Sequence, residues 1–267
     1  MQSNKIGFFD SGLGGLVIAK AVMAKLPKYD YIYYGDTKNL PYGNKSQKQI
    51  YELTINALTY LFGQGCLLVV IACNTASAKA LRKVQREFLP KRFPDRKVLG
   101  VIVPTIEEVV SDKKLKTIGI ISTSSTAKSH AYKKEIQKIA PALKVFEQAA
   151  PKLVPMIEND TLELIDVPLK GYLSGLIKRK VNALVLGCTH YPILKKQIQL
   201  AIGRNIKVFS QEEIIPKKLA LYLKKHKEIS ERLSKQSSRI FVVSKKTHVF
   251  EKISRKLFGR KINLRIR

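Results

Sequence analysis

Two cysteines stand directly after apolar runs, where a thiol could act as an acid or a base. Cys73 follows the run 67–72 (LLVVIA), and Cys188 follows the run 183–187 (ALVLG). Continuous apolar runs of this length are typical of buried strands in a parallel sheet, and open α/β sheets bind ligands at the carboxyl ends of their strands. Polar residues that could hold a ligand come next in both stretches: Asn74, Thr75, Thr189 and His190. The pattern predicts that both thiols face one ligand site.

Two thiols on opposite sides of a ligand suit the inversion of a carbon stereocentre that carries a proton. One group removes the proton from one face, and the other delivers a proton to the opposite face. Matched residues allow the reaction to run in both directions. A thiol with an ordinary pKa of about 8.5 needs a neighbour to act as a base. Asp10 and His190 are placed to give that help.

The residues alone leave other uses of the cysteines open. Cys73 and Cys188 could be small buried hydrophobes, which is our interpretation of Cys66 at the start of its strand. Both could bind zinc with His190 and Asp10, although the sequence has no C-x-x-C pair and the spacing C-T-H is short for a structural zinc site. A single cysteine nucleophile with a histidine partner would leave the second thiol unexplained.

Composition narrows the class of protein. The chain has 267 residues, 45% of them hydrophobic, as expected for a folded α/β protein with one large or two modest domains. It has no apolar run of about 18 residues and no signal-peptide pattern, so we expect a cytoplasmic protein without a membrane span. The net charge of +29 is spread along the chain without a nucleic-acid motif. We interpret it as a solvated surface, with polyanion or nucleic-acid binding as the alternative.

Alternating strand-like and helix-like segments position the polar residues. The first strand ends at Asp10, and Ser11 opens a glycine-rich turn that is either structural or a site for a substrate carboxylate. The Walker and dinucleotide-binding patterns are absent from this turn. Strands are expected at 5–10, 31–36, 67–72, 97–104, 117–123, 144–150, 183–187, 206–210, 239–244 and 261–266. Helices are expected at 16–26, 47–63, 162–178, 212–227 and 246–258, with others after residues 73 and 126.

These segments predict two similar α/β domains, each with a mostly parallel sheet flanked by helices. The segment 97–104 is expected to begin a second series of strands and helices. The basic tail is expected to return and complete the first domain. We therefore predict a first domain of residues 1–97 and 212–267, and a second domain of residues 98–211.

Five stretches, in this order and spacing, together resemble the glutamate racemase family. They are IGFFDSGLGGL, YYGDTKNLPYGNKS, VVIACNTASA, IGIISTSST and LVLGCTHYP. The resemblance covers most of residues 5–210, and CNTASA together with GCTHYP is its most specific part. The tail beyond about residue 211 matches loosely. Ala150 and the segment 209–211 also depart from the family pattern, so packing behind the site is expected to differ.

The resemblance implies an activity and a set of site residues. The site would lie in a cleft between the two domains, where Cys73 and Cys188 would exchange the Cα proton of glutamate without a cofactor or a metal. Asp10 would assist Cys73, and His190 would assist Cys188. The implied substrate-binding residues are Asp10, Ser11, Tyr42, Gly43, Asn74, Thr75, Thr123, Thr126, Glu158, Thr189 and His190.

The same resemblance implies a cellular role and partners. The product, D-glutamate, would be used in bacterial peptidoglycan synthesis. A homodimer is expected, with glutamate as the small-molecule substrate and no nucleic-acid partner. An aspartate racemase or another two-cysteine amino-acid racemase is the closest alternative, and a nucleic-acid-binding protein on the same fold is a remote one.

Overall fold

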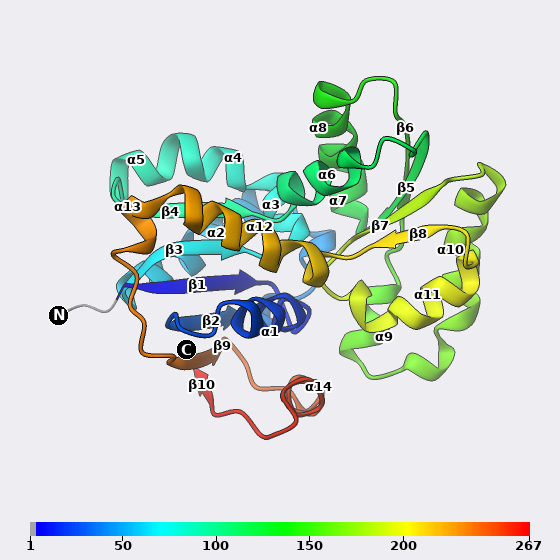
Figure 1. Ribbon diagram of the computed structural model, residues 1–267. Coiled ribbons are helices and arrows are strands. Elements are labelled where there is room, and N and C mark those ends of the chain that lie inside the picture. Colours follow the sequence, from blue (N-terminus) through cyan, green and yellow to red (C-terminus); the bar gives the residue numbers. More distant parts are fainter. Residues whose placement is uncertain (1–3) are drawn as a thin grey trace.

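The computed structural model describes residues 4–267 as two parallel sheets flanked by helices (Figure 1). The first sheet has six strands in the order β10-β9-β2-β1-β3-β4, and the second has four in the order β6-β5-β7-β8. All neighbouring strands within each sheet run parallel. The predicted α/β fold class is confirmed.

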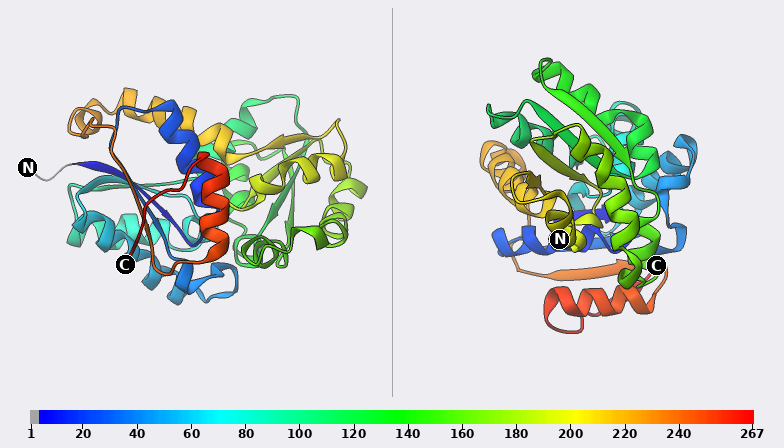
Figure 2. Two further views of the ribbon diagram at one scale, coloured as in Figure 1. Left: turned by 90° about the horizontal axis from the view of Figure 1, so that it is seen from below. Right: turned by 90° about the vertical axis from the view of Figure 1, so that its right-hand side faces the viewer.

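The first sheet combines the start of the chain with its tail. Its strands are β1 (Lys5–Asp10), β2 (Tyr31–Gly35), β3 (Cys66–Ile71), β4 (Lys97–Gly100), β9 (Arg239–Val243) and β10 (Leu264–Ile266). Strand β9 pairs with β2, and β10 pairs with β9 at the sheet edge. Figures 1 and 2 show this orange and red tail beside the blue first strands. The tail of the chain thus adds two strands to the first sheet.

Helices cover both faces of the first sheet, which explains why its central strands are continuous apolar runs. Phe8 and Val70 face a core shared with α1 (Gly15–Lys25), α12 (Gln211–Lys225) and α14 (His248–Phe258). Their neighbours Phe9 and Val69 face a second core shared with α2 (Gln47–Gly63). Successive side chains of a strand point to opposite faces, so burial on both sides requires apolar residues at every position.

The second sheet is built from one continuous part of the chain. Its strands are β5 (Thr117–Ser122), β6 (Lys144–Ala149), β7 (Ala183–Gly187) and β8 (Lys207–Phe209). Its larger helices are α6 (Ile102–Ser111), α7 (Ser124–Ser129), α8 (Ala131–Ile139), α9 (Leu153–Glu158), α10 (Asp166–Lys178) and α11 (Lys195–Ile202).

Other helical segments connect these elements. Four are α3 (Asn74–Lys79), α4 (Leu81–Lys83), α5 (Leu89–Arg92) and α13 (Lys227–Ser230). The single-turn segments are η1 (Thr37–Asn39), η2 (Tyr42–Asn44), η4 (Leu162–Leu164) and η5 (Tyr191–Leu194), and η3 (Val84–Phe88) is a π-helical turn. No helix within residues 4–267 has the length and apolar character that crossing a membrane requires.

The segment 97–104 differs from the prediction. Strand β4 pairs with β3 at the edge of the first sheet and does not begin the second. The chain then turns into α6, where Pro104 lies in the first turn and its missing N–H is not needed for an intrahelical bond. The chain thus leaves the first sheet after β4 and returns between β8 and α12. The predicted domain limits, 1–97 with 212–267 and 98–211, stay a prediction.

Candidate active site

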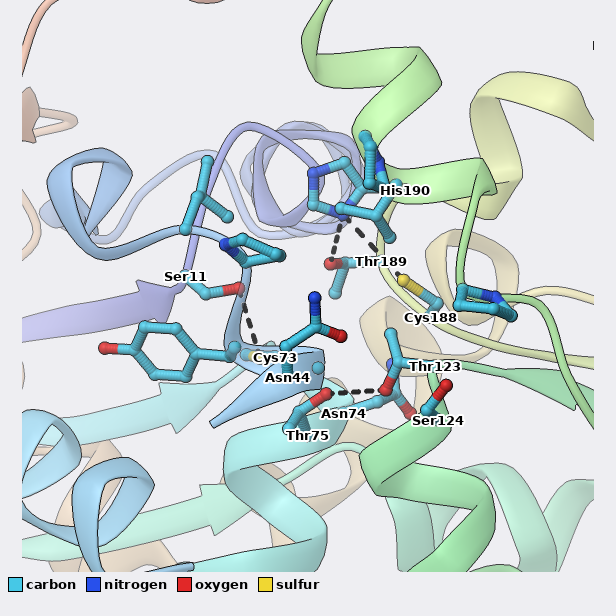
Figure 3. Close-up of a pocket in the computed structure, with 17 residues that line it drawn as sticks. Ser11, Asn44, Cys73, Asn74, Thr75, Thr123, Ser124, Cys188, Thr189 and His190 are labelled. Carbon is cyan, nitrogen blue, oxygen red and sulfur yellow. Dashed lines mark hydrogen bonds between the residues drawn. The ribbon is translucent and has the colours of Figure 1, made fainter. Parts of the chain in front are cut away.

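Both thiols line one small pocket at the carboxyl ends of the two sheets (Figure 3). Cys73 follows β3 after Ala72 and precedes α3, whereas Cys188 follows β7 directly. The two cysteines lie on opposite sides of the pocket, and neither forms a disulfide. The cavity volume is about 30 Å³. The lining residues are Ser11, Leu40, Pro41, Tyr42, Gly43, Asn44, Cys73, Asn74, Thr75, Thr123, Ser124, Pro151, Val154, Pro155, Cys188, Thr189 and His190.

Cys73 is a buried thiol with one hydroxyl neighbour. Its Sγ lies 3.4 Å from the Oγ of Ser11, and the residue is only 4% exposed. Burial raises the pKa of the Cys73 thiol to about 12, with the nearby Asp10 charge acting in the same direction and the Ser11 hydrogen bond opposing both. Cys73 is therefore a neutral thiol near neutral pH, which suits it to donate a proton.

Cys188 has a histidine as its neighbour. Its Sγ lies 3.8 Å from Nδ1 of His190, and Nε2 of the same ring lies 2.6 Å from Oε1 of Glu158. Burial disfavours the imidazolium, but the hydrogen bonds to Cys188 and Glu158 and the Glu158 charge together raise the pKa of His190 well above its ordinary value. A protonated imidazole therefore lies between the thiol and a carboxylate.

Asp10 lies behind the pocket wall and connects the two halves of the site. Its Oδ1 accepts a hydrogen bond of 3.1 Å from the Thr189 hydroxyl, and its Oδ2 accepts one of 2.9 Å from the Gly12 N–H. Burial raises the pKa of the Asp10 carboxyl, while the His190 charge lowers it. Asp10 thus holds the 188–190 loop against the first sheet and does not hydrogen-bond either thiol directly.

Two N–H groups of the glycine-rich turn after Asp10 bind carboxylates of the protein itself. The N–H of Gly12 binds Asp10, and the N–H of Leu13 donates a 3.1 Å bond to Oε1 of Glu158. These two donors are occupied by the protein's own carboxylates, so only the other N–H groups of the turn are available to a ligand, and binding of a substrate carboxylate by the turn stays a prediction. Gly14 is needed for close packing, because a Cβ there would lie 2.6 Å from the backbone of Thr189.

A cluster of hydroxyls forms the wall opposite Ser11. Thr75 Oγ1 lies 2.9 Å from Thr123 Oγ1 and 3.3 Å from Thr126 Oγ1. Thr123 is also the N-cap of α7, where its side chain accepts the N–H of Thr126. The residue that caps α7 is therefore the same residue that the sequence predicted at the site. Thr126 is fully buried behind Thr123 and does not line the pocket.

The 40–44 loop closes the pocket from the first sheet's side. Tyr42 lines the pocket but directs its hydroxyl away to Asp36 Oδ2, 2.7 Å distant. Burial, and then the Asp36 charge, raise the pKa of this phenol. Asp36 was not among the predicted residues. It acts by holding Tyr42, and no sequence motif marks a residue in that role.

The structure brings ten of the predicted residues to the pocket lining and places three behind it. The ten are Ser11, Tyr42, Gly43, Cys73, Asn74, Thr75, Thr123, Cys188, Thr189 and His190. Asp10, Thr126 and Glu158 lie behind and bind lining residues. Sequence reasoning missed seven lining residues, of which Asn44 and Ser124 directly follow predicted ones. The missed residues are Leu40, Pro41, Asn44, Ser124, Pro151, Val154 and Pro155.

Two further interpretations concern thiols and metals. Cys66 is fully buried in the core and its burial raises the pKa of its thiol to about 12, so the interpretation of Cys66 as a core residue is confirmed. Within residues 4–267, no three side chains of His, Cys, Asp or Glu are grouped as a metal site requires. The zinc set of Cys73, Cys188, His190 and Asp10 therefore does not form a ligand cluster.

The structure combines two parallel sheets with a pair of thiols at one pocket. Comparison with known proteins identifies the family that has this arrangement. The family model for Asp/Glu/Hydantoin racemases matches residues 17–211. The chain belongs to this family. It is 36% identical over 236 residues to a glutamate racemase from Dinoroseobacter shibae, with 84% of this chain and 85% of that protein covered. A glutamate racemase from Corynebacterium diphtheriae is 41% identical over 216 residues, covering 80% of this chain and 78% of that protein.

Solved structures give the same family. A glutamate racemase isoform from Bacillus anthracis superposes with a TM-score of 0.89 at 30% identity, covering 100% of this chain and 98% of that one. The glutamate racemase from Francisella tularensis, solved in complex with D-glutamate, gives a TM-score of 0.87 at 32% identity with the same coverage. The resemblance inferred from the sequence is confirmed.

Proposed function

We propose that the protein is a glutamate racemase that interconverts L- and D-glutamate by moving a proton at Cα. The observation that carries this proposal is the pair of thiols on opposite sides of one pocket, each with its own polar neighbour. The relatives at 36–41% identity are glutamate racemases by name, and one solved relative contains D-glutamate. This combination favours glutamate over the other amino acids of the wider family.

The proposed reaction uses the two cysteines in turn. One sulfur, as a thiolate, removes the Cα proton from one face, and the other, as a thiol, gives its proton to the opposite face. The C–H bond that breaks is replaced by one new C–H bond, so one thiol and one thiolate exchange states and the net charge is unchanged. Cys73 enters as the donor when its thiol is neutral, and Cys188 can exchange its proton with the neighbouring imidazole of His190.

The remaining polar residues would hold the substrate. Ser11, Thr75, Thr123 and Asn74 present hydroxyl and amide groups to the pocket, which suit carboxylates. Thr189, whose hydroxyl binds Asp10, directly follows Cys188 and also lines the pocket. These assignments, and the supporting roles of Asp10, Glu158 and Thr126 behind the wall, form part of the proposal.

Incubation with L-glutamate in deuterium oxide tests activity and mechanism together. We expect loss of optical activity with one deuterium at Cα of the product, and no loss of rate when a chelator is added. L-aspartate in a parallel reaction separates the closest alternative. Glutamate that keeps its optical activity, or that inverts without deuterium at Cα, would contradict the proposal.

Serine variants of each cysteine test the two-base assignment. Cys73→Ser and Cys188→Ser should each lower racemisation by orders of magnitude, because a hydroxyl is a far weaker acid than a thiol. A glutamate analogue with a leaving group on Cβ needs only one base to eliminate. Each variant should therefore eliminate from only one enantiomer, and the two variants should prefer opposite enantiomers. Equal loss for both enantiomers in either variant would refute separate roles.

We further propose that the enzyme works in the cytoplasm and supplies D-glutamate for peptidoglycan. The relatives are named glutamate racemases, which supports D-glutamate as the product. The homodimer stays a prediction, which light scattering of the purified protein would test. Weak, strongly salt-dependent binding to DNA is all that the net charge of +29 should produce.

A further inference from the structure

Asn74 is held by a buried polar cluster that the proposed reaction does not use. Its amide forms a reciprocal pair with Gln211, in which Asn74 Nδ2 donates to Gln211 Oε1 at 2.8 Å and Gln211 Nε2 donates to Asn74 Oδ1 at 2.9 Å. The hydroxyl of Tyr132 donates a second bond to Asn74 Oδ1, 2.6 Å long. Gln211 and Tyr132 are fully buried, and Asn74 is 2% exposed.

A fourth residue decides which way the two amides point. A reciprocal amide pair would be equally satisfied if both amides were turned over, since each would still offer one donor and one acceptor. Thr105 removes this symmetry. Its hydroxyl proton is committed to the carbonyl oxygen of Val101 at 2.6 Å, so its oxygen can only accept from the neighbouring Gln211, whose Nε2 lies 3.4 Å away. The donor end of Gln211 must therefore face Thr105.

Thr105 fixes the orientation of the Gln211 amide, and Gln211 in turn fixes the orientation of the Asn74 amide. With one N–H of Gln211 Nε2 facing Thr105, the other donates to the oxygen of Asn74, which also accepts from the Tyr132 hydroxyl, so both lone pairs of this oxygen are used. One N–H of Asn74 Nδ2 binds Gln211, and the second N–H has no partner in the cluster. Asn74 lines the pocket beside Cys73, so this N–H is the one hydrogen-bonding group that its amide can offer a ligand.

We propose that Gln211 is a positioning residue that fixes the Asn74 amide as a hydrogen-bond donor toward a carboxylate of the substrate. Tyr132 and Thr105 support it. The inference rests on the proposed function, because the ligand is taken to be an amino acid with carboxylates. It also assigns a task to α12, which begins at Gln211 where the chain returns from the second sheet. An amide left free to turn would present its oxygen to the carboxylate for part of the time and repel it.

A double-mutant cycle tests the proposal. Asn74→Ala should raise KM for glutamate about tenfold or more, the usual scale for a lost hydrogen bond to a charged group. Gln211→Met keeps the size of the side chain but cannot orient Asn74, and should raise KM by at least about twofold while kcat changes less. If Gln211 acts through Asn74, the double variant should have the KM of Asn74→Ala alone.

A matched control separates positioning from general stability. Gln85→Met removes a 2.9 Å hydrogen bond to the carbonyl of Val98, away from the pocket, and should leave KM unchanged even if it lowers Tm. If Gln211→Met does not fold, the same cycle with Thr105→Val carries the test, because this variant removes the hydroxyl oxygen that fixes the donor end of Gln211.

Two results would overturn the inference. In one, the KM effects of Gln211→Met and Asn74→Ala multiply in the double variant. In the other, both Gln211→Met and Thr105→Val fold and keep the KM of the parent. A parent enzyme that does not racemise glutamate at all would instead refute the proposed function, so the two failures are distinct.

Discussion

Replacing Glu158 by Gln should lower the pKa of His190 while leaving the local geometry in place. The amide oxygen of the new side chain can still accept from the Leu13 N–H and from the imidazole, but the negative charge is gone. A hydrogen bond between two charged groups is worth about 1.5–3 kcal/mol, and the imidazolium loses much of this stabilisation relative to the neutral ring, so we expect the pKa of His190 to fall. Both side chains are largely buried, so solvent screens little of this effect.

Proton NMR of the histidine rings measures this shift directly. The chain has four histidines, and His190 is the buried one, which makes its signal separable from the three that are exposed or half-buried. Glu147→Gln is the matched control, because Glu147 binds His130 at 2.6 Å and not His190. An unchanged His190 pKa in Glu158→Gln, or a parent His190 that titrates at its ordinary value, would refute the reasoning.

The ion pair between His190 and Glu158 should also make the free energy of unfolding of Glu158→Gln differ from that of the parent over a defined pH range. A histidine whose folded pKa is raised stabilises the protein fully below the ordinary histidine pKa, and this contribution is lost as the pH rises through the folded pKa. The free energy of unfolding of Glu158→Gln should therefore fall furthest below that of the parent near pH 6. The difference should shrink at higher pH. A difference that grew with pH would contradict the sign of the shift.

Three further outcomes follow from the structure. Alkylation of Cys73, followed by peptide mass spectrometry, should accelerate about tenfold per pH unit from pH 7 to 10, because burial raises its thiol pKa to about 12; a plateau near pH 9 would contradict this. Gly12→Ala should inactivate the enzyme at unchanged expression, since the new Cβ would overlap Glu158 Oε1 and lie 3.0 Å from Leu40; full activity would show that the carboxylate can move. Ser46→Ala removes the capping box of α2 and should cost about 1 kcal/mol, seen as a Tm lower by about 2–4 °C with activity retained; no change in Tm would mean that water replaces the cap.

Periodicity predicted most of the elements because buried strands must be apolar. The segments β3 and β7 are buried at every position, and helix α2 has the predicted bounds. The assignment of β4 to a sheet could not be read from the same pattern. An edge strand with a half-buried sequence is compatible with either sheet, and its pairing depends on the position of β3 in space.

The candidate site was predictable where chemistry and strand ends coincide. Cys73 and Cys188 stand out because each follows an apolar run, and their hydroxyl neighbours follow in the chain. Gln211 gives no such signal. Its contacts are with Asn74 and Tyr132, which are far away in the sequence, so only the folded structure brings them together.

The first sheet contains strands from the beginning and the end of the chain, so it cannot be completed until synthesis is nearly finished. Residues 117–209 contain every strand of the second sheet, so that sheet can form as soon as β8 has left the ribosome. Strand β2, in contrast, has an unpaired edge until β9 is made near the end of translation. An exposed edge of this kind is a template for pairing with other chains. A nascent chain that stalls before residue 239 therefore has all strands of the second sheet, but its first sheet keeps an unpaired edge that is prone to aggregation. This edge is paired only when the last strands have been made.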